Sequence, residues 1–85
     1  MLFVMASGFV ISFGERVRQL RNAQGVSQET LADRAGLHRT HISLIERGKR
    51  SVQLETIENL AQALGVQPAI LIPDIKVRRK RLNVK

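Results

Sequence analysis

Residues 28–47 read QETLADRAGLHRTHISLIER, and this stretch decides the fold of the chain. Its apolar side chains recur at helical spacing on both sides of Gly36, which predicts two short helices over 28–35 and about 39–47. Gly36 suits a tight turn between them, because glycine adopts a positive φ at little cost. Ser27 is well placed to cap the first helix. The stretch therefore predicts two packed helices at a fixed angle.

The apolar positions form one wedge between these two helices. Ala32 faces the second helix where the two cross closely, since a larger side chain would push them apart. The other members of the wedge are Leu31, Ala35, Leu37, Ile42 and Ile45. Polar side chains then occupy the outer face of the second helix: Arg39, Thr40, His41, Ser43 and Arg47. That face is free to meet a partner.

An earlier helix precedes this pair. Ser12 and Glu15 have the spacing of a capping box, which predicts that the helix starts there and runs over about 13–24. The apolar residues 1–11 lack the positive region of a signal peptide and are interpreted as an N-terminal extension.

Two more helices follow the pair. Apolar residues at spacings of three and four predict a helix whose inward face is Leu54, Ile57, Leu60, Ala61 and Leu64. Pro68 suits the first turn of a short helix over about 68–72, and Pro73 stops it. No strand pattern competes, so the predicted fold is all-α, with five helices in a domain over 12–75.

The positive charge of the chain is concentrated at its C-terminal end. The net charge is +7 over 85 residues. Residues 1–73 contain eight Lys or Arg against six Asp or Glu, whereas residues 74–85 contain six against one. Such a balance predicts an anionic partner, either nucleic acid or a membrane surface. The basic tail over 76–85 is expected to be loose; its charge density favours contact with DNA phosphates over a merely solvated terminus.

Several function classes are disfavoured by what the sequence lacks. It has no cysteine, no nucleophile–base pair and no paired carboxylates, and its glycines are interpreted as helix stops rather than as a phosphate loop. His38 and His41 are three residues apart, but no third metal ligand is evident. No stretch is long enough to span a membrane. We therefore expect no enzymatic activity, no cofactor, no metal, no membrane partner and a cytoplasmic location.

The longer pattern QETLADRAGLHRTHISLIERGKR, followed by ETIENLAQALGV, resembles the phage repressor and Cro class of helix-turn-helix regulators, also called the XRE family. Within it, RTHISLIERGKR resembles the controller proteins of restriction–modification operons. The resemblance spans about residues 13–73. Gln53 departs from the usual Ser or Thr cap, and Ile70 stands where a polar residue is common. The resemblance implies a compact lambda-repressor-like domain that binds a palindromic double-stranded DNA operator as a homodimer.

The resemblance also implies roles for individual residues, with the helix over about 39–47 in the major groove. The residues expected to contact bases are Arg39, which can span guanine O6 and N7, and Thr40, His41 and Ser43. Those expected to contact phosphates are Gln28, Arg47, Lys49 and Arg50. Arg21 and Glu46 are expected to form an ion pair between the first helix and the recognition helix. The alternatives are solvated surface charges.

An apolar patch near the C-terminal end suggests the dimer interface. Ile70, Ile72 and Ile75 flank Leu71 and Pro73, and one helical turn cannot send all of these side chains into its own core. Exposed apolar patches on small domains usually mark a partner surface. A second function class stays open at this point: an antitoxin that binds a toxin protein through its apolar N-terminus or its tail and represses its own operon.

Overall fold

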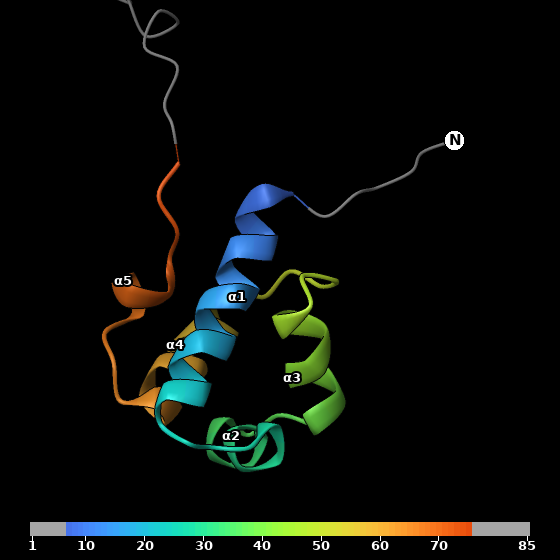
Figure 1. The fold of residues 1–85 in the computed structure, drawn as a ribbon, viewed down its shortest axis with the longest axis vertical. Helices are drawn as coiled ribbons and strands as arrows, with labels where there is room; N and C mark the ends of the chain where they lie inside the picture. Colours follow the sequence, from blue (N-terminus) through green and yellow to red (C-terminus); the bar gives the residue numbers. More distant parts are fainter. Residues whose placement is uncertain (1–6, 76–85) are drawn as a thin grey trace, which may run out of the picture.

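The computed structural model describes residues 7–75, which form five helices (Figure 1). These are α1 (Gly8–Ala23), α2 (Gln28–Ala35), α3 (Arg39–Glu46), α4 (Leu54–Leu64) and α5 (Pro68–Leu71). Residues 7–75 contain no strand, so the predicted all-α fold is confirmed. In Figure 1, α3 and α5 lie on opposite sides of α1. The predicted basic tail, 76–85, lies outside the described residues.

The start of α1 differs from the prediction. Ser7 is the N-cap, and its hydroxyl oxygen accepts a hydrogen bond from the Val10 amide at 3.1 Å. Ser12 lies inside the helix and is exposed, so the capping box predicted there is wrong. The helix continues back because its first turn packs on the end of α3, where Ile11 lies against Gly48. Residues 8–11, predicted to belong to an extension, are therefore part of α1.

The core lies between α1, α2, α3 and α4 and is closed by α5. Its fully buried large side chains are Val17, Leu31, Ile42, Ile45, Leu60 and Leu71. Burying a side chain of this kind contributes about 1.5–3 kcal/mol relative to leaving it exposed. One predicted core residue is wrong: Leu54 is 84% exposed. It is the first residue of α4, and the buried face of that helix begins only at Thr56.

The helix-turn-helix itself has the predicted caps and turn. The Ser27 hydroxyl accepts from the Thr30 amide at 3.0 Å and starts α2. Gly36 ends α2 with a φ of 72°. The Leu37 amide then donates to the Ala32 carbonyl at 2.8 Å, and Ala32 is buried where α2 meets α3. The turn is thereby fixed by local hydrogen bonds and by the apolar wedge.

Candidate nucleic-acid interface

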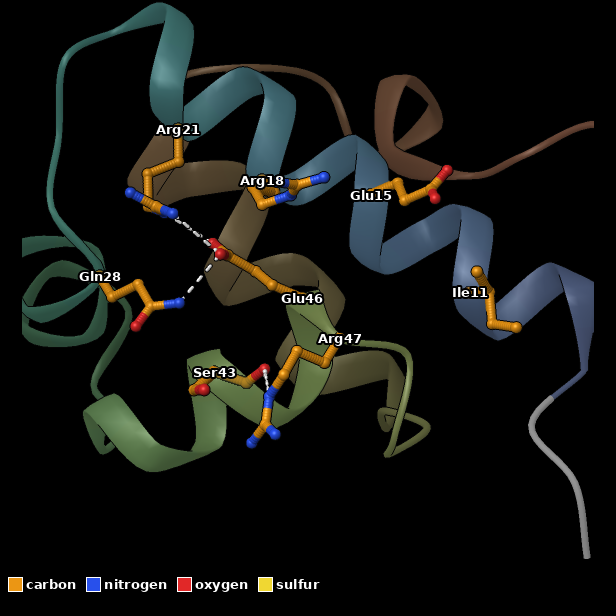
Figure 2. A pocket seen from close by; sticks show the side chains of 8 residues that line it. All are labelled: Ile11, Glu15, Arg18, Arg21, Gln28, Ser43, Glu46 and Arg47. Atoms are coloured by element: carbon orange, nitrogen blue, oxygen red, sulfur yellow. Dashed lines mark hydrogen bonds and ion pairs between the residues drawn. The ribbon is translucent and has the colours of Figure 1, made fainter.

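The buried carboxylate of Glu46, the last residue of the recognition helix α3, links α3 to α1 and α2 (Figure 2). Arg21 of α1 donates from Nε to Glu46 Oε2 at 2.6 Å and from Nη2 to Glu46 Oε1 at 2.9 Å. Gln28 of α2 donates from Nε2 to the same Oε1 at 3.0 Å. Arg21 Nη1 also donates to the Val26 carbonyl at 2.8 Å. The predicted ion pair is confirmed, and it is part of a larger set of hydrogen bonds that includes Gln28 and the Val26 carbonyl.

The hydrogen bonds among Arg21, Gln28 and Glu46 hold a fixed geometry because the ion pair within them is largely buried. The Glu46 side chain is 2% exposed and that of Arg21 is 12% exposed. The hydrogen bond that Arg21 donates to Glu46 raises the pKa of Arg21 above its ordinary value, although burial opposes the shift and the charge of Glu46 adds to it. Bidentate arginine–carboxylate pairs fix orientation as well as distance. The set therefore holds α3 at one angle to α1 and α2.

Gln28 has a role in this set that the sequence did not indicate. It was predicted to contact phosphate, whereas its amide group is half-buried and bound to Glu46. An amide nitrogen carries two hydrogens, so a second donor remains for a phosphate oxygen. Gln28 thus positions α3 first, and its phosphate contact stays a prediction.

The outer face of α3 is polar, as predicted. Arg39 and Thr40 are exposed in its first turn, and His41 and Ser43 are half-exposed on the following turn. His38 occupies the N-cap position but makes no side-chain capping hydrogen bond.

The cations that follow α3 are also accessible. Arg47 is exposed at the C-cap, where its Nε donates to the Ser43 carbonyl at 3.3 Å. Lys49 and Arg50 are exposed in the loop that leads to α4. These positions leave their charges free to meet an anionic backbone.

A cleft of about 390 Å³ brings several of these residues together between α1, α2 and α3 (Figure 2). Its lining residues are Ile11, Glu15, Arg18, Arg21, Gln28, Ser43, Glu46 and Arg47. Arg18 is a cation on this face that the sequence reasoning missed. The signal was available, because Arg18 lies three residues before Arg21 and thus on the same side of the helix.

His41 makes the stability of the domain depend on pH. Desolvation lowers its pKa below the ordinary value of about 6.5, and the charges of Arg50 and then His38 add to the shift. The folded state thus disfavours the protonated imidazole. We expect its contribution to stability to be complete above pH 6.5 and to be lost as the pH falls from there toward the folded pKa. Thermal unfolding at pH 7.5 and 5.5 should show a smaller pH difference for His41→Gln than for the unaltered protein. An identical difference would contradict the assignment.

The expectations about metal sites and membrane spans can be compared with the structure only over residues 7–75. Within that range, no group of three or more His, Cys, Asp or Glu side chains is arranged to hold a metal ion. None of the helices described there has the length and apolar character needed to cross a bilayer.

Comparison with known proteins identifies the class. The helix-turn-helix family matches residues 17–71, from the middle of α1 to the end of α5. The chain therefore belongs to the helix-turn-helix family of DNA-binding transcription regulators.

Within this family the chain is similar to control proteins of restriction–modification systems. It is 49% identical over 69 residues to control protein C.BamHI of Bacillus amyloliquefaciens, with 80% of this chain and 85% of that protein covered. The crystal structure of the restriction–modification controller protein C.AhdI from Aeromonas hydrophila matches with a TM-score of 0.73 and 48% identity, covering 74% of this chain and 96% of that one. The resemblance seen in the sequence is confirmed.

A second structure shows a related protein on DNA. The controller protein C.Esp1396I, as a tetramer in complex with its natural 35 base-pair operator, matches with a TM-score of 0.72 and 29% identity, covering 76% of this chain and 86% of that one. None of these three relatives is an antitoxin, so the alternative function gains no support from them.

Proposed function

We propose that this protein is a homodimeric regulator that binds a palindromic operator in double-stranded DNA and controls a restriction–modification operon. The observation that carries the proposal is the exposed polar face of α3, held in place by the buried contacts among Arg21, Gln28 and Glu46. The likeness to C.BamHI and C.AhdI supports the operon class. Such a regulator acts in the cytoplasm, where the operator lies.

Base contacts are assigned to the first turns of α3. Arg39 is exposed and can reach guanine O6 and N7 with two parallel hydrogen bonds, while Thr40 offers a methyl group to thymine or a hydroxyl to phosphate. His41 and Ser43 are half-exposed and make secondary contacts in this proposal.

Phosphate contacts are assigned to the rim of the same surface. Arg47, Lys49 and Arg50 follow the recognition helix, and Gln28 lies at the start of α2. We add Arg18, because it lines the cleft together with Gln28 and Arg47. Such contacts set the register of the protein on DNA without reading its sequence.

Selection of bound sequences from a random DNA pool tests the proposal, and recovery of a palindrome is the expected result. Arg39→Ala should then weaken binding to the selected operator by about 1–3 kcal/mol and relax the preference at one symmetric base pair. The matched control is Arg34→Ala, an exposed arginine at the end of α2, which should leave the preference intact. Unchanged base preference for Arg39→Ala would remove Arg39 from the base contacts.

The homodimer interface is assigned to the end of the domain. Ile70, Ile72 and Ile75 are 45%, 37% and 66% exposed, whereas Leu71 between them is fully buried. Arg16 of α1 donates from Nη1 to the Ile70 carbonyl at 2.7 Å and so positions α5. The three isoleucines then present an apolar surface to a partner while Leu71 anchors it. Their place in the interface is a proposal.

A further inference from the structure

A second hollow, a small apolar groove, lies on the other face of α1 from the cleft. Its volume is about 110 Å³, and its lining residues are Phe9, Val10, Phe13, Arg50, Ser51, Val52, Ile57 and Ile72. Helical spacing explains the separation: Phe9 and Phe13 are four residues apart on one face, while Ile11 points to the opposite face and lines the cleft. The groove thus joins the first turn of α1, the loop before α4 and the segment after α5.

Apart from Arg50 and Ser51, the side chains that line the groove are apolar. Phe9 and Ile72 line it and are nevertheless 40% and 37% exposed. Leu54, which is 84% exposed, lies one turn before Ile57 of the groove wall on α4. No charged residue occurs in 7–14 or in 69–73. Exposed apolar side chains gathered in this way on a small domain usually mark a contact with another protein.

We propose that a second copy of this chain covers the groove, so that the first turn of α1 is part of the dimer interface. The inference rests on the homodimer proposed above and adds to it a part of the chain outside the helix-turn-helix match over 17–71.

The area that a dimer needs supports this choice of partner. Stable interfaces bury about 800 Å² on each partner, contributed by roughly 20–30 residues. Helix α5 has four residues, and three isoleucines around it provide only a fraction of that area. The groove is continuous with them because Ile72 belongs to both surfaces. Phe9, Leu54 and the groove walls therefore supply apolar area that the isoleucines lack.

The position of the groove also connects dimerisation to DNA binding. Arg50, assigned to a phosphate, lies at the rim of the groove in the loop between α3 and α4. A partner seated in the groove packs against this loop. The distance between the two recognition helices in the dimer is then set partly by the first turn of α1.

Sedimentation equilibrium of the full chain tests the proposal. Phe9→Ser should raise the dimer dissociation constant at least tenfold. Ile11→Ser is the matched control: Ile11 lies in the same turn and is 41% exposed, but faces the cleft, so the constant should stay within threefold. Phe9→Leu, which keeps an apolar side chain, should also stay within threefold. Equal effects of Phe9→Ser and Ile11→Ser would overturn the proposal.

Because the chain has no cysteine, a single introduced thiol gives a second measurement. Val52→Cys places one thiol on the groove wall, in the loop before α4. Its alkylation should slow at least tenfold when the protein concentration is raised from below to above the dissociation constant. A rate independent of concentration would show that a second copy does not cover the groove, which overturns the proposal.

Ile70→Glu distinguishes a failure of the groove proposal from a failure of the homodimer proposal. If the unaltered chain is monomeric at all concentrations, the homodimer fails and the groove proposal fails with it. If Ile70→Glu dissociates the dimer while Phe9→Ser leaves the dissociation constant unchanged, only the groove proposal is overturned. Dissociation of the dimer by both variants supports the extended interface.

Discussion

Gly14→Ala is expected to destabilise the domain by about 3 kcal/mol, the upper end of the cost of overpacking a core. A methyl group at Gly14 would overlap the carbonyl oxygen of Ile45 and lie 3.0 Å from the Ile45 carbonyl carbon and 3.2 Å from that of Glu46. These are backbone atoms of α3, which cannot rotate away as a side chain can. The effect reverses the usual gain of about 1 kcal/mol when alanine replaces glycine inside a helix.

Urea unfolding at 25 °C measures this change directly. Gly8→Ala is the control, because Gly8 is exposed in the first turn of α1 and an added methyl group meets no atom within 4 Å. It should change the free energy of unfolding by no more than about 0.5 kcal/mol. If Gly14→Ala were as stable as Gly8→Ala, α1 and α3 would not pack at this distance in solution.

Gly14 is an example of a feature of the fold that the periodicity of the sequence does not predict. The glycines were interpreted as helix stops, and this holds where φ is close to +70°, at Gly25, Gly36, Gly48 and Gly65. Gly14 lies inside α1 and is needed because a backbone 31 residues later approaches it. A close approach depends on both partners, and periodicity describes only one helix at a time.

Local signals, in contrast, predicted most of the helix boundaries. Ser27 and Gly36 delimit α2 through hydrogen bonds and a backbone angle within a few residues of each end. The start of α1 was misplaced because the capping-box rule favours Ser12, which has a glutamate three residues later. Ser7 caps without such a partner.

The functional surface was predicted in part. The exposed positions of α3 follow from its period, because the apolar wedge determines which side chains point outward. The contact between Gln28 and Glu46 was not predicted, since it joins residues 18 positions apart across two helices. Arg18 could have been found from its spacing to Arg21 on one side of α1, although its place beside Gln28 and Arg47 depends on the packing of α1 on α3.

Arg21→Ala is expected to lower the stability by about 3 kcal/mol, because removing one partner of a buried ion pair leaves the other charge uncompensated. The Glu46 side chain is 2% exposed and would keep only its hydrogen bond from Gln28. The Val26 carbonyl would also lose a donor. For a domain of this size the melting temperature should fall by more than about 10 °C.

Thermal unfolding of four variants separates the charge from the packing. Arg34→Ala removes an exposed arginine from α2 and should leave the melting temperature within a few degrees of the unaltered protein. Glu46→Gln added to Arg21→Ala removes the buried charge and should recover part of the lost stability, whereas Glu46→Gln alone leaves Arg21 without its anion. The two single changes and the double change then give the interaction energy of the pair. Equal melting temperatures for Arg21→Ala and Arg34→Ala would show that the pair does not form in solution, and α3 would lose the contact that fixes its angle to α1.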